Sequence, residues 1–237
     1  MERRDSVLSH APTRVPSFRP RALRGDQHLL FIGQNGSGKS ILARFLLKLA
    51  RKRGWRIVIV DPKKDWMTYL ETKQKFAEKG LGTIDSPWLV ETFRPELAVQ
   101  IIQPVEWNEQ CAKFFRDIIA CRNTIVYVDE ITQLANANIV PREIKIIWTQ
   151  GRSINVGGWC ATQRPKGIPI VVKSESKVWF LFRINSRDDR QVVEGHIPID
   201  DMPEVVDKPL PQYWFYYWES SMEQPVLVRP IDLEKVA

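Results

Sequence analysis

Residues 33–40 read Gly-Gln-Asn-Gly-Ser-Gly-Lys-Ser, a stretch whose residue types and spacing can hold a polyphosphate. It fits the pattern G-x-x-x-x-G-K-[ST], in which glycines let backbone N–H groups point inward. The Lys39 amine can reach the β- and γ-phosphates, and the Ser40 hydroxyl can bind Mg²⁺. We therefore predict ATP and Mg²⁺ as cofactors. The predicted nucleotide-binding residues are Gly33, Gln34, Asn35, Gly36, Ser37, Gly38, Lys39, Ser40 and Ile41.

Two neighbouring carboxylates form a second candidate site. Asp129 and Glu130 follow the apolar run 124–128, which we expect to be a buried strand beside the strand of the phosphate loop. Ligands of open α/β sheets bind at the carboxyl ends of strands. Asp129 is therefore predicted to hold Mg²⁺, and Glu130 to polarise the attacking water. A small-molecule kinase needs no such glutamate, so the pair favours ATP hydrolysis.

The elements that must position these residues alternate along the chain. Short apolar runs predict strands, and segments with apolar residues on one face predict helices. This alternation predicts an α/β fold with a mostly parallel central sheet flanked by helices and a C-terminal β hairpin. The expected strands are 29–32, 56–60, 99–102, 124–128, 158–162 and 178–182, the expected helices 40–53, 66–79, 106–121, 142–150 and 187–194, and the hairpin 213–218 with 226–228.

Composition sets the domain organisation and the partner class. The 237 residues are enough for one domain, predicted over 27–237, and the net charge of +7 favours an anionic partner such as nucleic acid. Residues 1–26 read as a flexible, basic Pro/Arg-rich tail. That tail is either a variable leader or an arm that contacts DNA or a neighbouring subunit. The sequence has no apolar run long enough for a transmembrane segment. The aromatic stretch 213–218 is interpreted as core-filling.

Several further segments carry a family resemblance. Ala-Thr-Gln-Arg-Pro at 161–165, with Gly151-Arg152 before it and Arg183 after it, resembles the FtsK/HerA superfamily of DNA-pumping ATPases. The run Val-Asp-Pro-Lys-Lys-Asp at 60–65 is similar to the same family, as is the pair at 189–190. The similarity extends over about 28–195. The small size, without extra domains, looks most like the packaging ATPases of membrane-containing icosahedral viruses.

This resemblance implies a RecA-like (ASCE) P-loop NTPase core that assembles into a ring, commonly a hexamer. Gln163 matches the polar residue that contacts the γ-phosphate or the attacking water. Arg152 matches an arginine supplied to the nucleotide of the neighbouring subunit, where it would neutralise developing charge. Arg183 and Arg190 are alternatives for that arginine. Arg152 could instead be a cation favoured at the end of a helix.

The predicted function is an ATP-hydrolysing translocase that packages viral double-stranded DNA into a preformed capsid. Capsid or viral-membrane portal proteins are the further partners, and the host cytoplasm or the virion is the expected location. The alternatives are a DNA-transfer or phage-assembly ATPase, a nucleotide-dependent scaffold or assembly factor, and a small-molecule kinase. Candidate DNA contacts are Lys63, Lys64, Lys73, Lys75, Lys79, Arg142, Lys145, Lys166 and Lys173.

Overall fold

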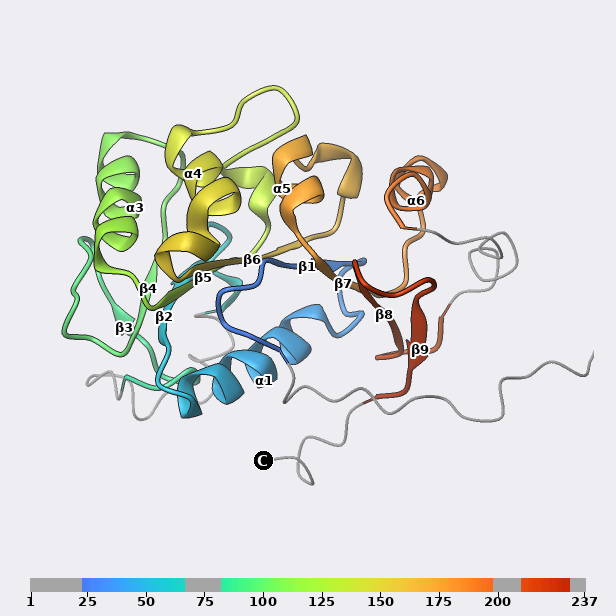
Figure 1. Cartoon of the computed structure of the whole chain (residues 1–237), viewed down its shortest axis with the longest axis horizontal. Coiled ribbons are helices and arrows are strands. Elements are labelled where there is room, and N and C mark those ends of the chain that lie inside the picture. Colours follow the sequence, from blue (N-terminus) through green and yellow to red (C-terminus); the bar gives the residue numbers. More distant parts are fainter. Residues whose placement is uncertain (1–22, 67–81, 198–209, 231–237) are drawn as a thin grey trace, which may run out of the picture.

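The computed structural model describes residues 23–66, 82–197 and 210–230, and these form one central sheet between layers of helices (Figure 1). The strand order is β3-β4-β2-β5-β6-β1-β7-β8-β9. All pairs from β3 to β7 are parallel, and β8 and β9 add an antiparallel hairpin beside β7. The predicted sheet and hairpin are therefore confirmed. The strands are β1 (Leu29–Ile32), β2 (Arg56–Val60), β3 (Trp88–Leu89), β4 (Val99–Ile102), β5 (Thr124–Val128), β6 (Val156–Thr162), β7 (Val178–Leu181), β8 (Phe215–Glu219) and β9 (Val226–Val228).

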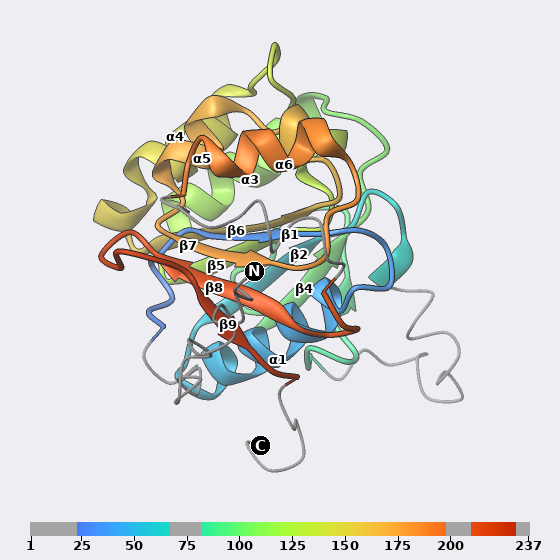
Figure 2. The same cartoon turned by 90° about the vertical axis from the view of Figure 1, so that its right-hand side faces the viewer.

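Helices cover both faces of the sheet. Helix α1 (Lys39–Lys52) lies on one face, and Figures 1 and 2 both show the other helices on the opposite side. Those helices are α3 (Glu109–Cys121), α4 (Arg142–Gln150), α5 (Ile170–Glu175) and α6 (Arg187–Glu194). A sheet covered on both faces needs strands that are apolar at nearly every position, which explains the unbroken apolar runs in the sequence.

Successive side chains of the central strands point to opposite faces of the sheet and so divide the core into two clusters. Leu30, Val58 and Val126 face α3 and α4, whereas their neighbours Leu29 and Ile57 face α1. All five side chains are fully buried. The central strands are thus held from both sides, and their carboxyl ends form a rigid edge on which a site can be built.

Three expectations need correction. The strand ending at Asp129 does not pair with the phosphate-loop strand, because β6 lies between β5 and β1. Helix α3 begins at Glu109 rather than at 106, because the Asn108 side chain caps it by accepting a hydrogen bond from the Cys111 N–H at 2.9 Å. The short elements β3 and α5 were not predicted. The expected helix 66–79 falls almost entirely outside the described residues, as does most of the tail 1–26.

Candidate active site at the carboxyl edge of the sheet

The phosphate loop is anchored to the strands on both sides of β1. The Gly33 N–H donates to the Thr162 carbonyl at the end of β6 (3.2 Å), and the Gln34 N–H donates to the Arg183 carbonyl just after β7 (3.0 Å). These bonds continue the parallel ladders for one more residue on each side. The loop therefore starts from a fixed position before it turns into α1.

Glycine is required at two positions of the loop. Gly36 and Gly38 have φ angles of 72° and 108°, which L side chains rarely adopt. A Cβ atom on Gly38 would also lie 2.9 Å from the ring of Tyr213. Gly38 is the N-cap of α1. The helix N-terminus therefore opens directly onto the loop, as phosphate binding needs.

Lys39 lies inside the cradle that the loop forms. Its Nζ donates to the carbonyls of Gly33 (2.6 Å) and Gln34 (2.9 Å), and the residue is only 8% exposed. Burial lowers the pKa of Lys39 to about 8, although the nearby Asp129 and Glu130 act in the opposite direction. A polyphosphate would give this amine stronger acceptors than the two carbonyls it now contacts.

Asp129 stands at the carboxyl end of β5, close enough to Lys39 for each charge to shift the pKa of the other. Its Oδ1 accepts a hydrogen bond from the Tyr127 hydroxyl at 3.0 Å. Burial raises the pKa of Asp129, whereas the Tyr127 hydrogen bond and Lys39 lower it. The hydrogen bond from Tyr127 fixes one oxygen of this carboxylate, and the Ser40 hydroxyl is the second candidate ligand. One carboxylate and one hydroxyl suit Mg²⁺, which takes few protein ligands when phosphates supply the rest.

Glu130 is the most constrained side chain of the site. Its Oε1 accepts hydrogen bonds from the hydroxyls of Thr132 and Thr162, both at 2.6 Å. Its Oε2 accepts from Lys63 Nζ at 3.0 Å and from the Gln163 N–H at 3.3 Å. Burial raises the pKa of Glu130, but these donors outweigh burial and the net shift is downward. Its backbone is left-handed (φ 65°), an uncommon conformation for a residue with a side chain.

Strand β6 delivers the polar residues between Glu130 and the phosphate loop. Thr162 is fully buried, and its hydroxyl both donates to Glu130 and accepts from the Arg164 N–H at 3.0 Å. Gln163 follows directly and is partly buried. Sequence reasoning named Gln163 but missed Thr132 and Thr162. Thr162 belongs to the Ala-Thr-Gln-Arg-Pro run at 161–165, from which no role followed for it, and Thr132 is a hydroxyl three residues after Asp129.

Known proteins share both sequence and fold with this chain. The family described as AAA-like domain matches residues 22–93. The DNA packaging ATPase P9 of Enterobacteria phage PRD1 is 25% identical over 216 residues, covering 86% of this chain and 87% of the relative. The genome packaging NTPase B204 of Sulfolobus turreted icosahedral virus 2, in complex with sulfate, matches with a TM-score of 0.70 at 14% identity. That match covers 88% of this chain and 98% of B204.

The chain has the fold of the viral genome-packaging ATPases. The resemblance that the sequence indicated is thereby confirmed. B204 has also been solved with ATP-gammaS (TM-score 0.69, 15% identity). VirB4 of Thermoanaerobacter pseudethanolicus is less similar in fold, with a TM-score of 0.59 at 12% identity over 92% of this chain and 94% of VirB4.

Within this packaging-ATPase fold, the candidate arginines lie in different places. Arg152 is exposed in the 3-10 turn Gly151–Ile154 before β6. Strand β6, which is seven residues long, lies between Arg152 and Gln163. At the usual rise per residue of a strand, β6 spans about 20 Å. Arg183 follows β7 beside the phosphate loop of its own chain, and Arg190 lies on α6. The structure brings Arg183 toward the site, but it does not bring Arg152 there within one chain.

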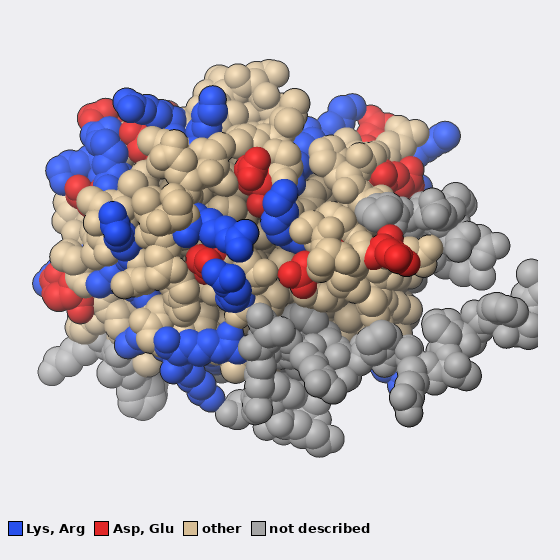
Figure 3. Space-filling view, in the orientation of Figure 1, with Lys and Arg blue, Asp and Glu red and all other residues tan. Residues whose placement is uncertain are grey.

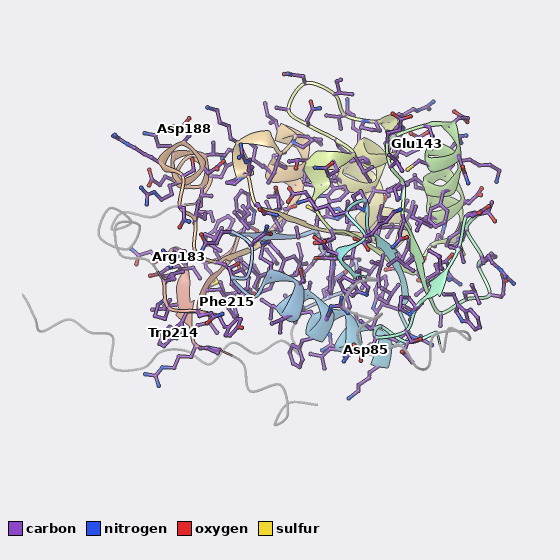
Figure 4. All side chains as sticks on the ribbon, turned by 180° about the vertical axis from the view of Figure 1, so that it is seen from behind. Asp85, Glu143, Arg183, Asp188, Trp214 and Phe215 are labelled. Atoms are coloured by element: carbon purple, nitrogen blue, oxygen red, sulfur yellow. The ribbon has the colours of Figure 1, made fainter. Side chains whose placement is uncertain are left out.

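An open pocket of about 370 Å³ adjoins the phosphate loop. Its lining residues include Gln34 and Asn35 of the loop together with Arg183, Tyr213 and Trp214. Figure 4 shows Arg183 and Trp214 at the same end of the molecule. The core-filling interpretation of 213–218 holds for the buried Phe215 but is wrong for Tyr213, which is 42% exposed.

The basic residues do not form one continuous stripe on the face shown in Figure 3, where blue and red side chains alternate. Of the candidate DNA contacts, Lys63 pairs with Glu130, Lys166 pairs with Asp188, and Lys173 is 8% exposed. Lys73, Lys75 and Lys79 lie outside the described residues. In the described part of the chain, no helix has the length and apolarity to cross a membrane.

Proposed function

We propose that this chain is the ATP-hydrolysing motor that packages viral double-stranded DNA into a preformed capsid. The observation that carries the proposal is the convergence of Lys39, Asp129 and Glu130 at one sheet edge, in a fold shared with packaging ATPases. The similarity to the PRD1 packaging ATPase along most of both chains points in the same direction. The alternative of a DNA-transfer ATPase is less well supported, because the conjugation coupling proteins match the fold less closely, with TM-scores of 0.57 and 0.56.

The catalytic roles follow from the position of each group. Lys39 neutralises charge on the β- and γ-phosphates, and the N–H groups of the loop from Gly33 to Ser40 hold their oxygens. Ile41 supplies a further N–H at the start of α1. Glu130 orients and polarises water, once one of its four donors gives up its place to that water. Gln163, whose backbone N–H donates to Glu130, would sense the γ-phosphate with its side chain.

Magnesium is the metal that the donor set fits. Ser40 would contribute its hydroxyl and Asp129 the oxygen that Tyr127 does not occupy. Bound between them, the ion would neutralise phosphate charge during hydrolysis. The Tyr127 hydroxyl would then serve to orient the Asp129 carboxylate.

The working unit in this proposal is a ring, and a hexamer is the expected form. Arg152 is exposed and distant from its own phosphate loop, so a catalytic role requires the nucleotide of a second copy. Arg183 and Arg190 are the competing candidates. Each copy would contribute one ATPase domain, residues 27–237, preceded by the basic tail 1–26.

Double-stranded DNA in the ring pore would be held through its phosphates, independently of sequence and weakened by salt. Capsid or viral-membrane portal proteins would anchor the ring. The motor would act in the host cytoplasm or on the virion. A nucleotide-dependent scaffold would instead bind ATP without DNA-stimulated turnover.

The test is the ATP hydrolysis rate of the full chain with and without double-stranded DNA, alongside the mass of the assembly in solution. We expect stimulation by DNA and a ring-sized mass, with stimulation declining as salt rises. Lys39→Ala is the control for contaminating ATPases. Turnover that DNA leaves unchanged, in an intact ring, would contradict the motor.

A further inference from the structure

A groove lies far from the phosphate loop, between the carboxyl end of β4 and the start of α3. It has a volume of about 380 Å³, within the range of ligand-binding pockets. Leu89, Gln103, Val105, Glu106 and Phe114 are among its lining residues, and we call it the β4–α3 groove. No residue assigned above to the binding of ATP, Mg²⁺ or water lines this groove.

Two apolar side chains at this groove face solvent. Val105 is 83% exposed and Leu89 is 59% exposed, and Trp88 beside Leu89 is 38% exposed. Exposed large apolar residues that gather around a hollow mark an interaction site, whereas single ones need no explanation. The groove therefore favours a partner with an apolar side chain.

Polar groups of the same groove lack partners within the described part of the chain. The buried Nε2 atom of Gln103 has no hydrogen-bond acceptor there. The exposed carboxylates of Glu91 and Glu106 form no ion pair with any described residue. A partner that offers a carbonyl oxygen and two cations would satisfy all three groups.

The chain carries a segment with this chemistry before its first described residue. Residues 12–21 read Pro-Thr-Arg-Val-Pro-Ser-Phe-Arg-Pro-Arg. Its three prolines remove backbone N–H donors. Val15 and Phe18 are its apolar side chains, and Arg14 and Arg19 are cations next to them in the sequence. Proline-rich segments are bound by grooves on partner proteins.

The point at which this segment joins the domain indicates which copy it reaches. Leu23 is buried near Arg53 and Trp55, on the α1 face and at the amino edge of the sheet. The groove lies at the carboxyl end of β4 and against α3. Figure 1 shows α3 on the other side of the sheet from α1. A donor and an acceptor on opposite sides of a molecule form a head-to-tail contact between copies, and such contacts generate a ring where the rotation closes.

We propose that residues 12–21 of one copy bind in the β4–α3 groove of the neighbouring copy. Val15 and Phe18 enter the apolar hollow, and Arg14 and Arg19 pair with Glu91 and Glu106. The interaction goes beyond the proposed motor activity, since it concerns how copies are joined and not what they hydrolyse.

Crosslinking of the full chain tests the contact directly. Phe18→Cys and Val105→Cys are combined in one chain. Two preparations of this variant, with tags of different mass, are mixed and then oxidised. A disulfide between copies is expected. A disulfide within one copy, or no disulfide, would overturn the proposal. The matched control pairs Phe18→Cys with Ile170→Cys, another exposed apolar residue (71% exposed) on α5. Equal crosslinking in that control would also overturn it.

A charge exchange gives a second measurement that does not depend on oxidation. Glu91→Arg with Glu106→Arg should raise the concentration needed for assembly about tenfold, and adding Arg14→Glu with Arg19→Glu should restore it. Unchanged assembly in the first variant, or no restoration in the second, would contradict the pairing. DNA-stimulated turnover of the unaltered chain is recorded in parallel. If DNA did not stimulate turnover of the unaltered chain, that result would count against the motor and not against this contact.

Discussion

Replacing Glu130 with glutamine separates catalysis from binding and folding in this site. Glutamine has nearly the same shape but cannot act as a base. Its carbonyl can accept from Lys63 Nζ and the Gln163 N–H, which are both donors. Its amide can then donate to Thr132 and Thr162, because hydroxyls also accept. Glu130→Gln should therefore fold and bind ATP.

The magnitude follows from the loss of base catalysis. A positioned general base contributes about 10²- to 10⁴-fold, which is about 3 to 5 kcal/mol of activation free energy. We expect DNA-stimulated turnover to fall by at least about a hundredfold, with ATP trapped on the protein. Phosphate release measures turnover, a fluorescent ATP analogue measures binding, and thermal unfolding measures stability.

Retention of most turnover by Glu130→Gln would refute the hydrolytic role and favour phosphoryl transfer to a metabolite. A comparable loss of ATP binding would show that the substitution disturbs the phosphate loop instead. The companion variant Thr162→Val removes one donor to the same carboxylate and leaves the base in place. It should reduce turnover far less than Glu130→Gln.

The remaining predictions concern binding and stability. Lys39→Ala should weaken ATP binding at least about tenfold in equilibrium titration, because a charged donor to the phosphates is lost. Gly157→Ala would place its Cβ 1.9 Å from the Gly25 carbonyl oxygen. The free energy of unfolding, measured by heat and by urea, should therefore fall by about 2 kcal/mol or more. The control Gly195→Ala, whose nearest atom is 3.5 Å away, should leave that free energy nearly unchanged. Burial lowers the pKa of His28 to about 4. The unfolded chain therefore takes up the proton first, and about 3 kcal/mol of stability should disappear as pH falls from 6.5 to 4. His28→Gln should remove that pH dependence, and an unchanged slope in urea titrations would contradict the assignment.

Local chemistry made the phosphate loop and the acids predictable. The glycines, Lys39 and Ser40 function within eight consecutive residues, and Asp129 and Glu130 simply follow an apolar strand. These features depend on backbone geometry next to the residues themselves. The central strands were predictable for the same reason, since burial on both faces demands unbroken apolar runs.

Contacts between distant segments were not predictable in this way. Lys63 is 67 residues from Glu130, and Tyr213 is much farther along the chain from Gly38. Their proximity depends on strand order, which is set by how the crossover connections pack and not by the pattern of any one segment. The prediction that Lys63 contacts DNA lacks this information, and the structure places the Lys63 amine on the Glu130 carboxylate.

The position of β6 explains why strand order matters for the chemistry. Neighbouring strands lie about 4.8 Å apart, so one intervening strand separates the ends of β1 and β5 by about 10 Å. Had β5 paired with β1, Asp129 would crowd the phosphate loop and leave little room for a triphosphate and its magnesium. The intervening strand opens that space and brings Thr162 and Gln163 to it, where both donate hydrogen bonds to Glu130. The same rigid strand leads back toward Arg152 at the opposite edge.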